Sequence, residues 1–281
     1  MLYSDRDLGK LIVPLIIEQT LAIAVGMADT IMISVAGEAA VSGVSLVDTV
    51  NILLINVFSA LATGGAVVSG HFLGQKRRED ASRAGWQIIL FATSLALAIT
   101  VAFIGFHAGL LRLMFGQIEP DVMRSARIYL IITAVSFPGL AVYNSCAAIF
   151  RAMNSAKVTM WISLLINAVN LIGNAVCIFG LKWGVAGAAV PTAVSRYVGA
   201  VLIFYLMFNE KREINFCGQV RFRFDLELIK RILFIAIPNG LENSMFQLGK
   251  ILVLSLVSTF GTYAIAANAV SNAIALFQIL P

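Results

Sequence analysis

The sequence contains few charged residues and few cysteines or histidines. Only 12% of its 281 residues are charged, whereas 59% are hydrophobic and the mean hydropathy is +0.90. A typical soluble domain carries about 25% charged residues. The three cysteines and two histidines show no metal-ligand or redox spacing. This composition excludes an ordinary soluble protein and a disulfide-stapled or zinc-stabilised domain, and it predicts an all-α protein that crosses the membrane several times.

Patterns of catalysis and nucleotide binding are also missing from the sequence. We find no nucleophile with a matching base and no Walker motif, and the glycine-rich stretches 63–70 and 184–189 follow no predicted strand. Such stretches of small residues favour close contact between membrane helices. The net charge of +5 arises from basic residues in short loops, which is typical of membrane topology signals rather than of nucleic-acid binding. We therefore expect no enzymatic activity, no resident cofactor and no nucleic-acid partner.

Apolar segments of membrane-spanning length divide the chain. They cover residues 11–35, 39–70, 85–111, 126–150, 158–181, 184–208, 232–258 and 263–281. The longest polar stretch follows the sixth segment, and its end at 225–232 predicts a short interfacial helix. We predict an N-terminal six-helix lobe at 1–208, a cytoplasmic linker at 209–231 and the start of a second lobe at 232–281.

The distribution of basic residues predicts the orientation in the membrane. If the N-terminus is cytoplasmic, 14 of the 20 lysine and arginine residues fall in cytoplasmic segments and four fall on the opposite side. Cytoplasmic loops carry such an excess of basic residues. We therefore expect a multi-pass protein of the plasma or inner membrane, with a cytoplasmic N-terminus and the lipid bilayer as its surroundings.

The first apolar segment carries two acids, Glu18 and Asp29, and no basic residue that could pair with them locally. An ionisable group at membrane depth costs about 2.5–3.5 kcal/mol on insertion scales, so such residues usually have a function. Eleven residues of helix return close to the starting direction, which places both acids on one face, about 16 Å apart. Asp29 is our candidate for a cation- or proton-binding carboxylate; the alternative is an acid solvated near the outer interface. Pro14 is a candidate hinge one turn before Glu18.

Neutral polar residues in other segments predict a polar interior. Asn167, Asn170 and Asn174 lie at offsets of 0, 3 and 7, so they share one helical face. They form either a polar wall opposite Asp29 or hydrogen bonds that only pack helices together. Three further candidates for the same interior are Asp48, Asn51 and Asn144.

An internal repeat relates the first and seventh apolar segments. A shift of 224 residues places Pro14 on Pro238, Glu18 on Glu242 and Gly37 on Gly261 without gaps. Repeats of the same topology indicate two halves related by an axis along the membrane normal. Because the second copy reaches only its second helix, we expect a C-terminally truncated form of a two-lobed protein.

The repeat also assigns hypotheses to polar residues of the seventh segment. Glu18 and Glu242 are either coupling or substrate contacts or a symmetric pair at an inner gate. Lys250 lies in the middle of its segment, where snorkelling to the interface is difficult, and it could pair with a carboxylate such as Glu242. Arg196, inside the sixth segment, raises the same question.

Several stretches resemble the multidrug and toxic compound extrusion (MATE) family. They include Pro14 followed by Ala28-Asp29-Thr30, together with GEAAVSGVSLV, SGHFLGQKRREDA, IFRAMNSAKVTMWISLLINAVNLIGNAVCIFG, KWGVAGAAVPT and FGTYAIAANAV, in that order along the chain. The resemblance implies an all-α fold of twelve helices in two six-helix lobes. This chain would supply the first lobe and the first two helices of the second. It also implies export of cationic or amphipathic organic compounds in exchange for Na⁺ or H⁺.

The resemblance implies roles for individual residues. Asp29 would be the acid tied to cation coupling, Pro14 the bend in the first helix and Asn170 a partner of the acid. Asn174 stands where many prokaryotic members carry a second acid, which leaves the identity of the coupling ion open. Na⁺ at Asp29 is the only metal ion we expect, and we expect a monomer. Two alternatives remain: a flippase for lipids or lipid-linked oligosaccharides from the same superfamily, with Lys250 and Arg196 facing its cavity, and a fragment that does not transport.

Overall fold

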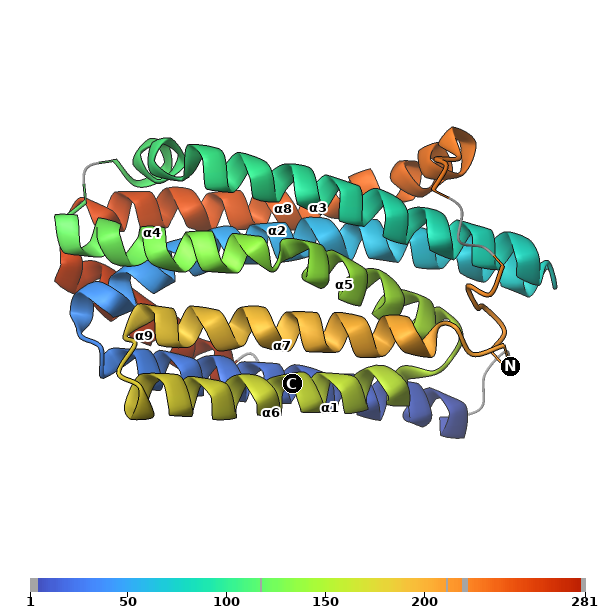
Figure 1. The fold of residues 1–281 in the computed structure, drawn as a ribbon, viewed down its shortest axis with the longest axis horizontal. Coiled ribbons are helices and arrows are strands. Elements are labelled where there is room, and N and C mark those ends of the chain that lie inside the picture. Colours follow the sequence, from blue (N-terminus) through green and yellow to red (C-terminus); the bar gives the residue numbers. More distant parts are fainter. Residues whose placement is uncertain (1–4, 117, 211, 219–221, 279–281) are drawn as a thin grey trace.

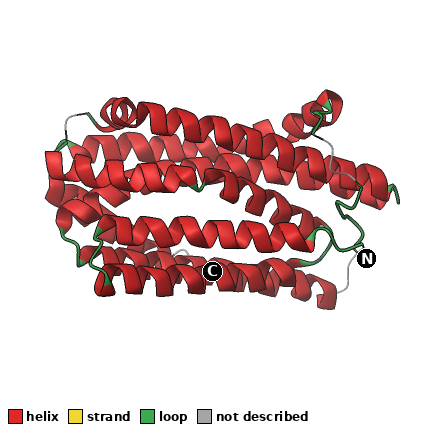
Figure 2. Cartoon of the chain, in the orientation of Figure 1, coloured by secondary structure: helices red, strands yellow, loops and turns green. Residues whose placement is uncertain are grey.

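The computed structural model describes residues 5–116, 118–210, 212–218 and 222–278, and within these residues the chain is a bundle of helices without a strand (Figures 1 and 2). The helices are α1 (Asp5–Ser34), α2 (Glu38–Gly74), α3 (Arg78–Phe115), α4 (Pro120–Val135), α5 (Phe137–Ala152), α6 (Ala156–Ala175), α7 (Val185–Leu206), α8 (Leu226–Ser258) and α9 (Thr262–Gln278). A π-helical turn, Val176–Gly180, continues α6. The predicted all-α fold class is confirmed.

Most of the predicted membrane spans are supported by the helices. Among the described residues, five helices are long and apolar enough to cross a membrane, and there are six if α4 and α5 count as one bent span. Eight were predicted, and the remaining two segments form α8 and α9. They fall outside this group because the described part of α9 covers only 17 residues and α8 contains several polar residues.

The fourth predicted span, 126–150, is not one straight helix. It is divided into α4 and α5, which are bent by 50° at Ser136. Pro138 lies at the start of α5, where its missing N–H and fixed φ end the preceding helix and begin a new one. The buried Ser136 hydroxyl donates to the Thr133 carbonyl over 2.6 Å, and the Ser136 N–H donates to the same carbonyl over 3.0 Å, so both groups of Ser136 cap the end of α4.

The predicted interfacial helix at 225–232 is also different in the structure. Residues from Leu226 onward are the first turns of α8 and are continuous with it. The Asp225 carboxylate accepts a hydrogen bond from the Leu228 N–H over 3.2 Å and so caps the helix. The residues before this cap are tied to α3, since the Gln87 amide donates to the Arg223 carbonyl over 2.7 Å and Arg83 pairs with Asp225 at 2.6 Å.

Helix α2 lies in the middle of the bundle and packs against α1, α3, α4, α5, α8 and α9. Glycines permit its closest approaches. A Cβ at Gly64 would lie 2.7 Å from the Ile232 carbonyl oxygen of α8, and one at Gly65 would lie 2.7 Å from the Ile88 side chain of α3. The predicted role of the stretch 63–70 in close helix packing is therefore confirmed.

One end of the bundle gathers the predicted cytoplasmic segments. Figure 1 shows the beginning of α1, the α2–α3 turn and the segment between α7 and α8 at the same end, with the connections α1–α2, α6–α7 and α8–α9 at the other. The described helices therefore run alternately up and down, as membrane spans joined by short loops do.

The two copies of the predicted repeat share the same backbone at their connections. Gly37 and Gly261 both have positive φ angles, 98° and 94°. The N–H of Gly37 donates to the Ser34 carbonyl, and the N–H of Gly261 donates to the Ser258 carbonyl in the same way. The α1–α2 and α8–α9 connections thus confirm the repeat at the level of local structure.

Candidate functional site

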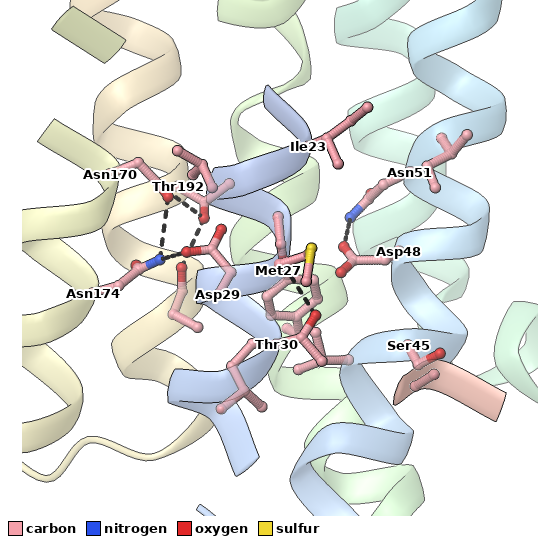
Figure 3. Close-up of a pocket in the computed structure, with 18 of the residues that line it drawn as sticks. Ile23, Met27, Asp29, Thr30, Ser45, Asp48, Asn51, Asn170, Asn174 and Thr192 are labelled. Atoms are coloured by element: carbon pink, nitrogen blue, oxygen red, sulfur yellow. Dashed lines mark hydrogen bonds between the residues drawn. The ribbon is translucent and has the colours of Figure 1, made fainter. Parts of the chain in front are cut away.

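A cavity of about 680 Å³ opens between α1, α2, α6 and α7, with Tyr129 of α4 and Ala269 and Asn272 of α9 also in its wall (Figure 3). Its wall is mostly apolar. The residues that carry a charge are Asp29 of α1, Asp48 of α2 and Arg196 of α7. A concave, largely apolar site with a few convergent polar groups is the usual form of a binding site for a small molecule.

Asp29 lies in a continuous chain of neutral hydrogen-bond partners. The Asn174 side-chain amide donates to Asp29 Oδ1 over 2.6 Å and to Asn170 Oδ1 over 3.2 Å. The Asn170 amide in turn donates to the Thr192 hydroxyl over 2.9 Å. Figure 3 shows these four side chains converging from α1, α6 and α7. The chain holds the carboxylate in place without supplying a positive charge.

One acceptor in this chain is left unused. The Oδ1 atom of Asn174 is buried and has no hydrogen-bond partner among the described residues. A buried acceptor without a partner costs roughly 1–3 kcal/mol, so native structures rarely keep one without a reason. A proton on Asp29 or a bound cation would give this oxygen the partner that it lacks.

The second acid has a different environment. Asp48 accepts a hydrogen bond from the Asn51 amide over 3.3 Å, and it also interacts with Tyr129, Arg196 and Asp29. Figure 3 shows Asp48 and Asn51 on the side of α1 opposite to Asn170 and Asn174. The two acids therefore share a cavity but not their hydrogen-bond partners.

The structure brings most of the candidate site residues together. Asp29, Asp48 and the asparagines Asn51, Asn167, Asn170 and Asn174 all line the cavity. The helical spacing of Asn167, Asn170 and Asn174 correctly predicted a polar wall opposite Asp29, because α6 packs directly against α1.

Two candidates from the seventh apolar segment lie elsewhere. Glu242 and Lys250 are exposed on α8 and do not line the cavity. The Lys250 ammonium lies 4.8 Å from the centre of the Phe246 ring on its own helix, not beside Glu242. The physical reason is that α8 packs its other face against α2 and α3. The spacing of polar residues alone does not predict which face of α8 is buried.

Three further candidates are also outside the cavity wall. Glu18 is half-buried and interacts with Arg151 and Thr159, and its Oε2 is buried with no hydrogen-bond partner among the described residues. Asn144 is half-buried on α5. Pro14 lies within helix α1, but its side chain is outside the described residues, so its role as a hinge stays a prediction.

Three residues of the site were missed by sequence reasoning. Thr192 and Ser195 of α7 line the cavity, as does Tyr129 of α4, and they lie beside Arg196, which the sequence had already raised as a charged residue inside a span. A signal for the α7 group existed, since positions 192, 195 and 196 have the i, i+3, i+4 spacing of one helical face. Tyr129 had no such signal, because its place depends on how α4 packs.

These features define the class of the protein. Membrane-length helices enclose a largely apolar cavity in which Asp29 has a neutral hydrogen-bond partner, and among the described residues no group of three His, Cys, Asp or Glu side chains could hold a metal ion. Intramembrane acids that face a cavity mark ion and substrate pathways. The fold and the site have the features found in multi-pass membrane transporters.

The family follows from comparison with known sequences. The sequence model of the MatE family matches residues 14–176, more than half of the chain, so the protein belongs to this family. The resemblance inferred from the motifs is thereby confirmed, and because members of the family are transporters, so is the expectation that the chain is not an enzyme.

Curated relatives cover almost all of the chain at low identity. An uncharacterized transporter YisQ of Bacillus subtilis is 26% identical over 95% of this chain and 59% of its own length. A probable multidrug resistance protein NorM of Thermotoga maritima is 25% identical over 98% of this chain and 60% of its own length. The chain thus spans about 60% of the length of these relatives.

Solved structures show the same fold. A MATE multidrug transporter in complex with R6G superposes with a TM-score of 0.90 at 22% identity, over 99% of this chain and 62% of that one. An inward-facing multidrug resistance MATE family transporter gives 0.85 at 22% identity, over 96% and 62%. A superfamily transporter from Pyrococcus furiosus, also at 0.85, is described as having a binding pocket of reversed polarity. Proteins of this fold therefore differ in the charge of their binding pockets, and the charge of this cavity depends on its own lining residues.

Proposed function

We propose that this chain provides the first lobe and the first helices of the second lobe of an antiporter, which exports small organic cations in exchange for H⁺ or Na⁺. The observation that carries the proposal is the environment of Asp29. Its carboxylate lies in a cavity large enough for a small organic molecule and accepts a 2.6 Å hydrogen bond from the neutral Asn174 amide. A carboxylate held in this way attracts a cation and can release it again.

The unused Oδ1 of Asn174 supports an exchange at this acid. When Asp29 is protonated, its O–H can donate to this oxygen. When Na⁺ binds, the carboxylate and the amide oxygen are both oxygen ligands. Either ion removes the negative charge that holds an organic cation, so the ion and the exported compound compete for the same carboxylate.

Exchange becomes transport only if binding favours different conformations of the protein. We infer that a cation arriving from outside neutralises Asp29, that α1 repacks against α6, and that the organic cation leaves. When the ion then leaves to the cytoplasm, the Asp29 carboxylate is negatively charged again and can bind another organic cation. Solved structures of the same fold are described as inward-facing and as outward-facing, which supports two such conformations for this fold.

The proposed orientation places the N-terminus and the segment between α7 and α8 in the cytoplasm of a bacterial-type cell, with the transporter as a monomer in the plasma membrane. The support is the excess of lysine and arginine residues at that end of the bundle.

The experiment compares wild type with Asp29→Asn in the purified chain in lipid nanodiscs. Binding of the organic monocation ethidium is measured by fluorescence while Na⁺ is raised at fixed pH, and then while pH is lowered at fixed Na⁺. We expect one of the two ions to displace ethidium from wild type and neither to displace it from the variant, whose affinity for ethidium falls by about tenfold or more. Glu242→Gln, which neutralises an exposed acid of α8, is the matched control and should behave as wild type.

Unchanged displacement in Asp29→Asn would overturn the proposal, because the ion would then act elsewhere. The flippase alternative has one observation in its favour, namely that Arg196 lines the cavity and could bind an anionic headgroup. It predicts that a soluble short-chain phosphatidylglycerol binds the cavity and that Arg196→Gln abolishes this binding.

A further inference from the structure

Arg196 is the one cation among the described residues that line the cavity, and it is firmly positioned. Its Nη1 donates to the Ser136 hydroxyl over 2.8 Å, at the break between α4 and α5. The next residue, Tyr197, donates from its hydroxyl to the Val135 carbonyl over 2.6 Å at the same break. Arg196 and Tyr197 of α7 thus both form hydrogen bonds to the bend between α4 and α5, and these bonds fix the position of the Arg196 guanidinium.

The charge of Arg196 acts on Asp48. The described charged and polar groups that interact with Asp48 are Asn51, Tyr129, Arg196 and Asp29, whereas the hydrogen-bond partner of Asp29 is the neutral Asn174 amide. Tyr129 interacts with Asp48, with Arg196 and, more weakly, with Asp29. Arg196 thus supplies a positive charge to the same cavity and acts on Asp48 at a distance, whereas Asp29 is held by a neutral partner.

We infer that Arg196 is a specificity-determining residue, which compensates Asp48 so that the cavity has one surplus negative charge and accepts one monovalent cation at a time. This inference rests on the proposed function, because it concerns the substrate of the same cavity. With both acids ionised, the three charged residues sum to a single negative charge. One monovalent cation makes the cavity neutral, whereas a divalent cation leaves an unpaired positive charge at low dielectric constant.

The inference also explains why a coupling ion and an organic monocation exclude each other. Each of them neutralises the cavity completely, so the second cation to enter would find no free negative charge. Competition at Asp29 then follows from the charge balance as well as from limited space.

The test uses ethidium and propidium, two dyes that share a phenanthridinium ring but carry one and two positive charges. Their dissociation constants are measured for the purified chain in nanodiscs at fixed pH and Na⁺ concentration. Wild type should bind ethidium more tightly. Arg196→Gln gives the cavity two surplus negative charges and should shift the ratio of the two affinities toward propidium by about tenfold. Asp48→Asn makes the cavity neutral and should weaken ethidium binding by about tenfold.

Two further variants separate charge from structure. The double variant Asp48→Asn with Arg196→Gln restores a single surplus negative charge, so its ratio should return to within about threefold of wild type. Arg196→Lys keeps the charge but not the planar guanidinium, and it should also keep the wild-type ratio. Lys250→Gln removes an exposed cation outside the cavity and is the matched control.

The inference is overturned if wild type does not prefer ethidium, if Arg196→Gln leaves the ratio unchanged, or if the double variant fails to restore it. Its failure can be distinguished from failure of the proposed function. The proposed function depends on displacement by Na⁺ or H⁺ at Asp29, whereas the inference depends on the ratio of two dyes at fixed ion concentrations. Displacement that survives in Asp29→Asn, together with a ratio that follows the charge of the cavity, would refute the exchange mechanism and leave the selectivity in place.

Discussion

The helix pairs α1–α2 and α8–α9 have the same backbone at their connections but different chemistry along their helices. The connections at Gly37 and Gly261 share positive φ angles and the same hydrogen-bond pattern. Asp29 of the first copy, however, corresponds to Val253 of the second, and Asp48 corresponds to Asn272. Asp29 lines the cavity, whereas Val253 is 61% exposed on α8.

This difference shows that the two copies share the glycines that the backbone turns require but do not share the acids that line the cavity. A glycine at the connection is needed wherever the chain must turn with positive φ. An acid at membrane depth is tolerated only where partners such as Asn174 surround it. The first copy has those partners on α6 and α7, and so the acids that line the cavity come from the first copy, whereas the second copy contributes the neutral Asn272.

Exchanging the acid between the copies should have the largest effect on stability. Val253→Asp places a carboxylate on an exposed face of a membrane helix, where insertion costs about 2.5–3.5 kcal/mol. Asp29→Val leaves one N–H of the buried Asn174 amide without its acceptor, at a cost of roughly 1–3 kcal/mol, but it also removes a carboxylate from membrane depth, so its net cost should be smaller than that of Val253→Asp. Denaturant unfolding of the purified chain in detergent measures both changes.

Val253→Asn is the control for polarity without charge, and it should be less destabilising than Val253→Asp. If Val253→Asp proves as stable as wild type, position 253 must have polar partners of its own, and the two copies would be chemically equivalent.

Sequence reasoning predicted the parts of the molecule that depend on local pattern. Long apolar segments predicted the helices, and the spacing of the α6 asparagines predicted which face meets Asp29. The same reasoning made Glu242 and Lys250 candidates for the cavity or an inner gate, and they do not line the described cavity, because a polar residue on a helix does not reveal which face packs inward. The contact of Arg196 with Ser136 could not be predicted either, since the two residues are 60 positions apart and the contact depends on how α7 packs against the bend between α4 and α5.

The two connecting glycines should show nearly equal effects of smaller size. Gly37→Ala and Gly261→Ala each place a side chain at positive φ, where L residues are strained, at a cost of roughly 1–3 kcal/mol. No atom lies within 4 Å of a Cβ added at either position, so backbone strain alone sets the loss. Denaturant unfolding of the two single variants checks the prediction, with Gly249→Ala, inside α8, as a control that should be neutral or slightly stabilising. Losses that differ by more than about twofold would show that the two connections are not energetically equivalent.

The smallest expected effect concerns the absence of a basic side chain near Asp29 in the first copy. It tests whether this absence allows Asp29 to bind an organic cation. In the repeat, Gly26 of α1 corresponds to Lys250 of α8. Gly26 lines the cavity, and no atom lies within 4 Å of a Cβ added there. A lysine at this position lies three residues before Asp29, on the same helical face, so its ammonium can pair with the carboxylate.

Gly26→Lys should therefore weaken the binding of ethidium by about tenfold, or about 1.4 kcal/mol, while the acid itself is retained. Gly26→Gln adds a side chain of similar length without charge, and it should weaken binding by less than about threefold if charge rather than bulk is responsible. The reverse change, Lys250→Gly, should leave binding unaltered, because that ammonium lies over Phe246 outside the cavity. Equal losses in Gly26→Lys and Gly26→Gln would mean that the cavity rejects added volume, and the argument that an uncompensated acid distinguishes the first copy from the second would then fail.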